Sequence, residues 1–488
     1  MADREHCRHM SSIEVHRQHY NVTFALLAVA AVSYALLQSL VAPALLTIQH
    51  DLHTTTAGAA WILSAYLLAA SVATPIAGRL GDMYGKKRLM VAVLVVLAAG
   101  TVLAGLATSI GLMIVARVIQ GAGGAIFPLA FAIIRDEFPP ERVPHGIALI
   151  SAILGIGGGL GIVLAGPILA HFSYHWLFWF PLVPVVGAIA GIVAFVPESP
   201  VRTRGRIDPT GAVLLSAWLV ALLVPISEGA SWGWTSARTL VLFAVAAALI
   251  PVWAWVESRS GAPVVDMRMM RLRGVWTTNL AALLLGFGMY SSFVLVPEFV
   301  ELPSSTGFGF GASVTKAGLF MVPATLGMLL AGPIAGRLSS TVGSKLPLLL
   351  GAIFSCAGFL VLAAAHSSDW EIYTAMLVMG IGIGFAFASM ANLIVEAVPG
   401  NQTGVATGMN TIVRTIGGAI GSQVAAGIVT ATLGANRLPT ETGFTVAFAA
   451  SAGALALALV ASLAVPGRTA AAEVSRRKIA AFRQGEAR

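Results

Sequence analysis

Fourteen stretches of about 20 mostly apolar residues run along this chain, each bounded by charged or turn-forming residues. A bilayer core about 30 Å thick takes about 20 residues of α-helix to cross, so each stretch predicts one membrane-spanning helix. The predicted spans are Phe24–Leu45, Ala60–Leu80, Met90–Leu106, Ile110–Ile134, Gly146–Ala170, Leu177–Val196, Gly211–Ile226, Leu240–Val256, Thr278–Val300, Gly318–Leu338, Leu346–Ala365, Ile372–Val395, Gly404–Thr432 and Thr445–Val465. The chain is therefore predicted to be an all-α membrane protein.

The composition supports a membrane location. Hydrophobic residues make up 57% of the 488 positions and charged residues only 10%, whereas a soluble domain carries about 25% charged residues. A net charge of +8 would suggest a nucleic-acid partner in a soluble protein. In a membrane protein, anionic lipid headgroups are the simpler partner, so we expect the lipid bilayer and no nucleic acid as partners.

The positions of the 29 Lys and Arg residues test the number of spans. Cytoplasmic loops retain positive charge, so a correct count should place most of these residues on one side. With both termini in the cytoplasm, only Arg238, Lys316 and Arg437 fall outside, and Arg117 and Arg414 fall within spans. One miscounted helix would invert every later loop, so the asymmetry favours an even number of spans.

The segments that flank the spans are polar. Residues 1–21 are predicted to be a disordered cytoplasmic arm, and residues 467–488 a basic cytoplasmic tail. The arm holds four of the ten histidines at irregular spacing, which favours a solvated arm over a metal site. Cys7 and Cys356 form no disulfide framework, so we expect no redox chemistry, metal or cofactor.

One short segment is written twice in the chain. Residues 75–87 read PIAGRLGDMYGKK and residues 333–345 read PIAGRLSSTVGSK. Each copy ends an even-numbered span, the second and the tenth, at the same face of the membrane. A second repeated pattern of Glu, Pro and Gly follows the fourth and twelfth spans. It comprises Glu137, Pro140 and Gly146 in the first copy and Glu396, Pro399 and Gly404 in the second.

The repeat predicts a duplicated architecture. Spans one to six and nine to fourteen form two copies of a six-helix bundle, at residues 22–200 and 270–466, and spans seven and eight are an insertion at residues 206–262. Two parallel repeats about an axis along the membrane normal resemble the way in which the major facilitator superfamily builds a central cavity that opens alternately to either side.

Two motifs resemble the major facilitator superfamily. Gly78–Arg88, GRLGDMYGKKR, resembles the loop motif between its second and third helices, and Arg117–Gly124, RVIQGAGG, resembles its fourth-helix motif. A count of fourteen spans resembles that of the branch of drug:proton antiporters with two extra central helices. Three segments also resemble that branch: Trp61–Tyr66 in the second span, Gly233-Trp234 in the loop after the seventh, and Asn410–Gly421 in the thirteenth. The resemblance implies a major facilitator fold of 6 + 2 + 6 helices in a monomer. It also implies a bacterial inner (plasma) membrane, with a small-molecule substrate and protons as partners.

The resemblance gives the first motif a role. Gly81 and Gly85 would permit the turn that closes a helix at Leu80. Asp82 would then dock on the first turn of the thirteenth span near Gly404, where the helix dipole favours a carboxylate. This contact can exist in only one rocked state, so it would act as a conformational latch. The latch comprises Asp82, Gly78, Gly85 and Arg88; the alternative is that Asp82 merely pairs with Arg88 at the surface.

The coupling group is harder to place. Burial raises the pKa of a carboxylate toward physiological pH, yet of the 21 acidic residues we expect only Glu298 inside a span. The position of the family's first-helix Asp is occupied by Leu37. The resemblance suggests Arg117 and Gln120 for proton coupling, with Glu298 and Glu301 as candidates for proton entry near the outer mouth. The alternatives are a structural clamp for Arg117 and solvent-exposed loop carboxylates for the two glutamates.

Two buried arginines and no mid-membrane carboxylate favour a neutral or anionic amphipathic substrate over a lipophilic cation. Aromatic and thioether side chains suit a pocket that accepts varied apolar ligands. For each candidate the alternative is a packing or lipid-facing role. The candidate cavity residues are Gln38, Trp61, Tyr66, Phe127, Phe131, Asn279, Tyr290, Phe293, Met321, Phe385, Phe387, Asn392, Asn410 and Arg414.

Glycine pairs four residues apart, in Gly157–Gly161, Gly380–Gly384 and Gly417–Gly421, predict faces on which helices approach closely. Gly155–Pro167 also resembles the bending segment of exporters but lacks its closing pair of glycines. The expected function is proton-driven efflux of amphipathic drugs, and the alternative is an importer of a small organic solute. A membrane-embedded enzyme or sensor is opposed by the absence of an HExxH zinc pair, a P-loop and a Ser/His/Asp grouping.

Overall fold

The computed structural model describes residues 20–199, 208–434 and 438–467. Fourteen helices in this part of the chain are long and apolar enough to cross a membrane, which confirms the predicted number of spans. The predicted terminal arm and tail lie almost entirely outside the described residues, as do the arm's histidines and Cys7.

The chain order gives two bundles and an insertion. The first bundle consists of α2 (Tyr20–Ser39), the short α3 (Leu45–Asp51), α4 (Thr56–Tyr84), α5 (Lys86–Gly105), α6 (Ile110–Gln120), the 3-10 turn η1 (Gly121–Ala125), α7 (Ile126–Glu137), α8 (Val143–His171) and α9 (Trp176–Phe195). The insertion consists of α10 (Pro209–Trp232), α11 (Ala237–Arg259) and the short α12 (Met267–Met270). The second bundle consists of α13 (Arg273–Glu301), η2 (Ser304–Thr306), α14 (Val314–Thr341), α15 (Lys345–Ala364), α16 (Asp369–Ala397), η3 (Gly400–Gln402), α17 (Thr403–Ala431) and α18 (Glu441–Leu463).

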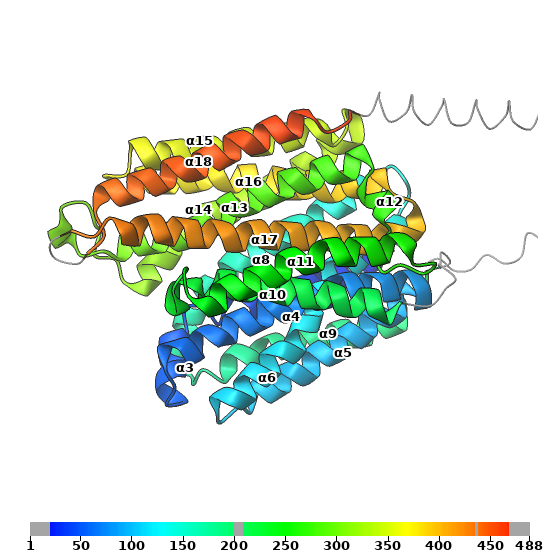
Figure 1. The fold of residues 1–488 in the computed structure, drawn as a ribbon, viewed down its shortest axis with the longest axis horizontal. Helices are drawn as coiled ribbons and strands as arrows, with labels where there is room; N and C mark the ends of the chain where they lie inside the picture. Colours follow the sequence, from blue (N-terminus) through cyan, green and yellow to red (C-terminus); the bar gives the residue numbers. More distant parts are fainter. Residues whose placement is uncertain (1–19, 200–207, 435–437, 468–488) are drawn as a thin grey trace, which may run out of the picture.

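Each bundle has its own buried core. One cluster is built mainly from the first bundle, around Leu94, Met113 and Phe178, and another mainly from the second, around Phe320, Phe359 and Phe448. The bundles meet where α8 packs along α14 and α4 packs along α17. The long helices run roughly parallel to one axis of the molecule (Figure 1).

The inserted pair lies against both bundles. Helix α10 contacts α4 and α17, and Figure 1 shows the green α10 and α11 between the blue α4 and the orange α17. The rings of Trp218 of α10 and Trp253 of α11 pack in a tilted arrangement, 5.6 Å between centroids, and join a buried cluster with Val405 and Met409 of α17. The insertion is therefore packed onto the second bundle at the end where α17 begins.

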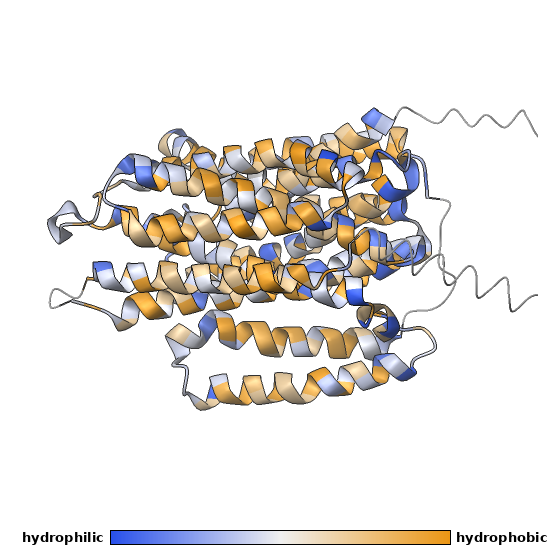
Figure 2. Cartoon of the chain, turned by 90° about the horizontal axis from the view of Figure 1, so that it is seen from above, coloured by the Kyte–Doolittle hydropathy of each residue, from blue (hydrophilic) through white to orange (hydrophobic). Residues whose placement is uncertain are grey.

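The first and last described helices reach the same end of the molecule. The ring of Tyr20 packs against that of Phe138, which follows α7, in a tilted arrangement with centroids 5.3 Å apart. Lys345, at the start of α15, donates a hydrogen bond from Nζ to the carbonyl of Leu463 at 2.7 Å. We call this end the basic end, because it also carries Lys86, Lys87, Arg88, Arg135, Arg142, Arg268, Arg271, Arg273 and Arg337. Hydrophilic residues gather at both ends of the molecule and hydrophobic ones lie between them (Figure 2).

The two copies of the repeated segment fold alike. The first copy ends α4 at Gly85, whose φ is 113°, and the second ends α14 just before Gly343, whose φ is 103°. The two glycines occupy equivalent positions in the repeat, and only glycine adopts a positive φ readily. The helix does not end at Leu80 as predicted: it continues through Gly81 to Tyr84, and Gly85 alone makes the turn.

Several helices extend past the predicted spans. Helix α10 continues to Trp232 and α11 to Arg259, so Glu228 and Glu257 lie inside helices and are buried. The expectation that Glu298 is the only acid within a span is therefore wrong. Each acid has a local donor to one oxygen: Ser231 donates to Glu228 at 3.0 Å, and the amide of Val265 donates to Oε2 of Glu257 at 3.3 Å, while Oε1 of Glu257 is buried without a partner among the described residues.

The glycine pairs all lie at helix contacts. Gly157 packs on Ala35 of α2, and Ser39 of α2 donates a hydrogen bond to the Gly157 carbonyl at 2.8 Å. Gly380 packs against Ala324 of α14, and Gly417 packs against the backbone of α13. The packing interpretation accounts for each pair, while the bending role of Gly155–Pro167 stays a prediction.

Candidate functional site: an interbundle gate and a central cavity

Asp82 lies in the last turn of α4, where its carboxylate reaches across to the second bundle. Its Oδ2 accepts a hydrogen bond from the amide of Val405 at 3.3 Å, in the first turn of α17, and the residue is fully buried. The backbones touch here: a Cβ on Gly78 would lie 2.6 Å from the carbonyl oxygen of Gly404. The docking that the family resemblance implied is present, and the helix dipole of α17 favours the negative charge at this place.

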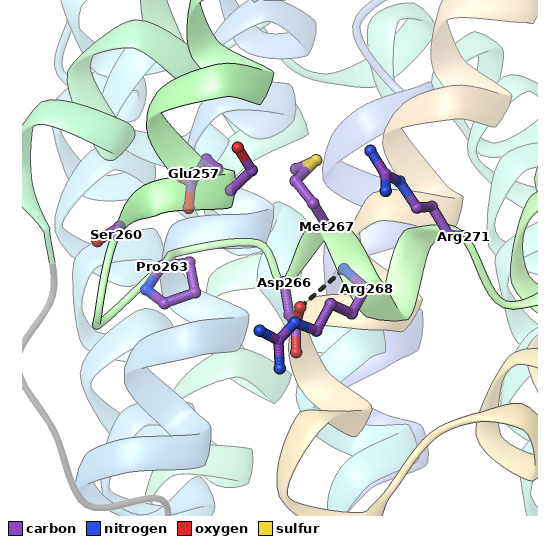
Figure 3. Close-up of a pocket in the computed structure, with 8 residues that line it drawn as sticks. Glu257, Ser260, Pro263, Asp266, Met267, Arg268 and Arg271 are labelled. Carbon is purple, nitrogen blue, oxygen red and sulfur yellow. Dashed lines mark hydrogen bonds between the residues drawn. The ribbon is translucent and has the colours of Figure 1, made fainter.

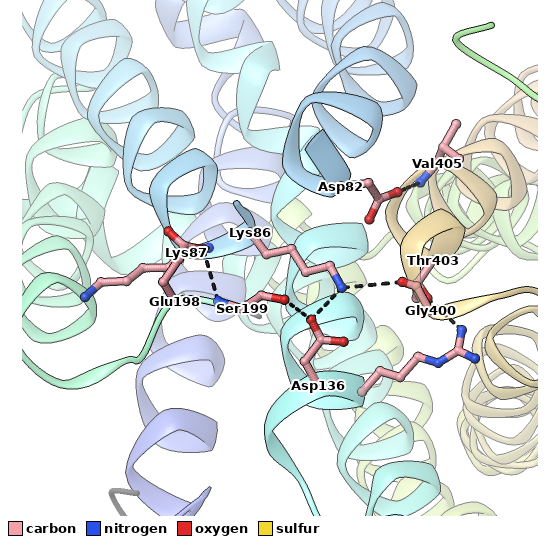
Figure 4. Close-up of polar contacts among 10 residues, drawn as sticks. Asp82, Lys86, Lys87, Asp136, Glu198, Ser199, Gly400, Thr403 and Val405 are labelled. Carbon is pink, nitrogen blue, oxygen red and sulfur yellow. Dashed lines mark hydrogen bonds and ion pairs between the residues drawn. The ribbon is translucent and has the colours of Figure 1, made fainter. Parts of the chain in front are cut away.

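Three further charged groups surround this contact (Figure 4). Lys86 forms an ion pair with Asp136 at 2.6 Å, and the two side chains are 0% and 4% exposed. Lys86 also lies 3.5 Å from the carbonyl of Gly400 in the second bundle. The hydroxyl of Ser199 donates to the same oxygen of Asp136.

Arg135 supplies the remaining link between the bundles. Its Nη1 donates to the hydroxyl of Thr403 at 2.7 Å and its Nη2 donates to the carbonyl of Val398 at 2.8 Å. We call Asp82, Lys86, Arg135 and Asp136, with the segment 398–405 that they contact, the basic-end gate. The gate joins α4, α5 and α7 to the connection between α16 and α17.

Arg88 is not part of this gate. Its side chain is 72% exposed, and its Nε lies 3.6 Å from Oε2 of Glu198. The predicted surface pair of Asp82 with Arg88 is therefore wrong, because Asp82 is buried against α17. The prediction that Arg88 belongs to the latch is also wrong, because Arg88 points to solvent at the start of α5. Glu198 instead accepts hydrogen bonds from the amides of Lys87 and Arg88 at 3.1 and 3.2 Å. Gly85 also leaves room for Glu198, because a Cβ there would lie 2.6 Å from Oε1.

The sequence reasoning missed Lys86, Arg135, Asp136 and Glu198 as partners. By sequence Lys86 is one of several positive charges in a loop, and its partner Asp136 lies 50 residues away along the chain. The consecutive charges of Arg135 and Asp136 at the end of the fourth span were a usable signal, because charged residues that enter a helix end need partners.

Arg117 of α6 is fully buried in the first bundle and links its own helix to two others. Its Nε donates to the carbonyl of Ile62 at 3.1 Å, and its Nη1 donates to the carbonyl of Leu37 at 3.1 Å and to Gln120 at 2.8 Å. The guanidinium also lies over the ring of Tyr66, 4.0 Å from its centroid. These contacts join α2, α4 and α6, as the clamp interpretation expects. A role of Arg117 and Gln120 in proton movement stays a prediction.

Arg414 lies between the bundles rather than inside one. It lines a narrow cavity, with a free volume of only about 10 Å³, together with Phe127, Phe131, Phe387 and Asn410, all predicted from the sequence. The other lining residues are Ser151, Leu154, Ala391, Thr407 and Thr411. They come from α7 and α8 of the first bundle and from α16 and α17 of the second, so the cavity lies at the interface between the two bundles.

Other candidate cavity residues lie elsewhere. Trp61 lines an apolar groove among α4, α5, α6 and α10 instead of the central cavity. Tyr66 packs under Arg117 within the first bundle. Asn392 donates to the carbonyl of Pro144 at 3.1 Å and so links α16 to α8.

The remaining candidates lie in the second bundle, apart from Gln38, which is half-buried on α2. Asn279 accepts a hydrogen bond from Asn410 at 2.9 Å, so it borders the cavity indirectly. Tyr290 and Phe293 contact each other on α13 at 5.9 Å. Met321 lies in the second core, and Phe385 packs against Phe354.

Glu298 and Glu301 lie at the far end of α13, opposite the basic end. Glu298 is half-buried and Glu301 is exposed. Their use in proton entry stays a prediction. Within the residues that the structure describes, no three His, Cys, Asp or Glu side chains are grouped to hold a metal ion.

A second hollow opens at the basic end, between the end of α11 and α12 (Figure 3). It measures about 340 Å³ and carries charges of both signs, including Glu257, Asp266, Arg268 and Arg271. Asp266 caps α12 through the amide of Arg268 at 2.8 Å and accepts a hydrogen bond from Gln402 at 3.2 Å. Because Gln402 directly precedes α17, this hollow borders the basic-end gate.

Comparison with known proteins agrees with this geometry. The family model of the Major Facilitator Superfamily matches residues 27–422 and 278–485. Multidrug resistance protein 3 of Bacillus subtilis is 30% identical over 335 residues, which are 67% of this chain and 64% of that protein. The alignment thus spans less than two thirds of that relative's length.

Two further likenesses extend the comparison. The Tetracenomycin C resistance and export protein of Streptomyces glaucescens is 27% identical over 79% of this chain and 71% of its own. The crystal structure of the human organic anion transporter MFSD10 (TETRAN) superposes with a TM-score of 0.64 at 15% identity, covering 91% of this chain and 99% of that one. The last likeness concerns the fold alone. The chain is a multi-pass membrane protein, and it belongs to the Major Facilitator Superfamily of transporters.

Proposed function

We propose that this protein is an exporter of amphipathic drugs, antibiotics or related small molecules, driven by the proton gradient and working by rocker-switch alternating access. The names of its relatives, multidrug resistance and export proteins, support a role in efflux. The observation that carries the proposal is the basic-end gate, which joins the bundles beside a cavity that both bundles line.

The basic end is proposed to face the cytoplasm of a bacterial cell. Among the described residues, Arg238 and Lys316 are the only Lys or Arg side chains at the opposite end, whereas the basic end carries a dozen. Positive residues are retained on the cytoplasmic side of a membrane protein. Since the first and last described helices both reach the basic end, both termini are proposed to be cytoplasmic.

In this orientation the gate closes the cytoplasmic side of the cavity. Opening it requires Asp82 to leave the amide of Val405, and Arg135 to leave Thr403 and the Val398 carbonyl. A hydrogen bond to a charged group contributes about 1.5–3 kcal/mol net, so these contacts together hold the closed state by several kcal/mol. The Lys86–Asp136 pair lies within the first bundle and can move with it as a unit.

Transport assays in membrane vesicles of known orientation test the proposal. Inverted vesicles with an acidified lumen should accumulate tetracenomycin C, which appears in the name of one relative, or a fluorescent drug. An uncoupler should abolish the accumulation. Protein with Asp82→Asn serves as a variant with an impaired gate. Proton-dependent movement into right-side-out vesicles instead would favour an importer, and no proton-dependent movement in either orientation would contradict both functions.

A further inference from the structure

The central cavity holds a single charged side chain among its described lining residues, and that side chain is Arg414. The other lining residues are aromatic, aliphatic or small and polar, and none is an Asp or Glu. We infer that the cavity selects amphipathic aromatic anions, with the guanidinium of Arg414 binding a planar oxyanion such as a carboxylate. The inference rests on the proposed function and names the substrate class for the same cavity.

Arg414 has no polar partner in the described part of the chain. It forms no ion pair and donates no hydrogen bond there, and its guanidinium lies over the ring of Phe387, 4.3 Å from the ring centroid. Arg117 provides the contrast, because carbonyls of two neighbouring helices and the Gln120 side chain accept its hydrogen bonds. Arg117 is therefore used by the fold, whereas the five N–H donors of Arg414 remain available to a ligand.

The depth of Arg414 argues against a surface role. It lies eleven residues after Thr403, which starts α17, so about 16 Å of helix separates it from that end at 1.5 Å per residue. A charged side chain near the middle of a membrane faces the bundle interior or a water-filled cavity and marks a functional site by default. Its position in the interbundle cavity agrees with that expectation.

The surroundings of Arg414 supply the rest of an anion site. Phe127 and Phe131 of α7 face it from the other bundle and offer rings for an aromatic ligand to stack on. Asn410, one turn before Arg414, donates to Asn279, whose own Nδ2 is buried with no acceptor in the described residues. The planar guanidinium can bind both oxygens of a carboxylate at once, which gives orientation as well as attraction.

The same arrangement disfavours a lipophilic cation. A cation in this cavity would meet Arg414 as a like charge with no described carboxylate among the lining residues to offset it. The position of the family's first-helix Asp is occupied by Leu37, whose carbonyl accepts from Arg117. Glu298 and Glu301 lie at the far end of α13 and do not line this cavity.

A binding experiment with two dyes of the same skeleton tests the inference. Fluorescein, an anion, and rhodamine 123, a cation, are titrated against the purified full chain in lipid nanodiscs, and fluorescence polarisation gives each dissociation constant. We expect fluorescein to bind at least tenfold more tightly than rhodamine 123. Arg414→Gln should weaken fluorescein binding tenfold or more without weakening rhodamine binding, and Arg414→Lys should restore much of it. Arg238→Gln, which removes an exposed arginine outside the cavity, should change neither.

Two results would overturn the inference: rhodamine 123 binding the unaltered protein as tightly as fluorescein, or Arg414→Gln leaving fluorescein affinity unchanged. If Arg414→Gln does not fold, the methyl ester of fluorescein decides on the unaltered protein, because loss of the carboxylate should weaken binding and equal affinity contradicts the site. Selective fluorescein binding without proton-driven transport in vesicles would refute the proposed function and leave the anion site standing. Proton-driven export of rhodamine without fluorescein binding would refute the anion site and leave the proposed function standing.

Discussion

Replacing Asp82 by Asn should open the basic-end gate without unfolding the protein. Asparagine keeps the shape of the side chain and an oxygen that can accept from the Val405 amide, but it removes the charge. A hydrogen bond to a charged group contributes about 1.5–3 kcal/mol, against about 0.5–1.5 kcal/mol for a neutral one. A helix N-terminus adds up to about 2 kcal/mol for a partly buried negative charge, and the lower cost of burying a neutral amide offsets part of the loss.

The net weakening of the closed gate is therefore about 1–3 kcal/mol, which shifts a two-state equilibrium about 5- to 150-fold toward the open state. Spin labels at the exposed positions Glu141 and Val342 lie at the basic end on opposite bundles. With Cys7 and Cys356 replaced, pulsed electron resonance between these labels reports the two populations as two distances. The longer distance should gain population in Asp82→Asn, while Asp369→Asn, which removes a half-exposed carboxylate at the opposite end, should leave the distribution unchanged. Asp82→Asn protein with an unaltered distribution and unaltered transport would refute the latch.

Three further predictions concern packing and buried charge. Lys86→Met leaves Asp136 as a buried carboxylate without its ion-pair partner, which should lower the free energy of unfolding by about 3–5 kcal/mol. A thermal or denaturant titration measures this loss, and a loss below about 1 kcal/mol would mean that the hydroxyl of Ser199 alone stabilises the Asp136 carboxylate. Gly78→Ala places a methyl group 2.6 Å from a carbonyl of α17 and should prevent gate closure and transport, whereas Gly187→Ala, with no heavy atom within 4 Å, should leave transport intact; equal activity of the two variants would contradict the close approach. Arg117→Lys keeps the charge but cannot reach all three acceptors, so it should lower stability by about 1–3 kcal/mol, and an unchanged melting temperature would argue against the clamp.

The sequence predicted the number and type of the helices because a membrane requires about 20 apolar residues at each crossing. The repeat was equally informative, since Gly85 and Gly343 both make the turn that their shared positions suggest. The helix ends were less predictable. Glu228 and Glu257 look like loop residues by composition, yet both lie inside helices, where a hydroxyl donates to one and a backbone amide to the other.

The site was predicted only in part, for a physical reason. Residue type alone placed Phe127, Phe131 and Arg414 in the cavity correctly, but Trp61 has the same character and lies in a groove outside the central cavity. Which face of an apolar helix points inward depends on the packing of its neighbours, and an evenly apolar helix carries no such signal. The Lys86–Asp136 pair is likewise a product of tertiary packing between α5 and α7.

Paired distance measurements at the two ends of the molecule test the central claim most directly. One pair of spin labels, at Glu141 and Val342, spans the bundles at the basic end, and a second pair, at Phe172 and Ser305, spans them at the opposite end; all four positions are exposed. If the bundles rock about the cavity, a change of proton gradient or addition of substrate must lengthen one distance and shorten the other. Distances that rise and fall together, or that do not respond, would contradict alternating access in this protein.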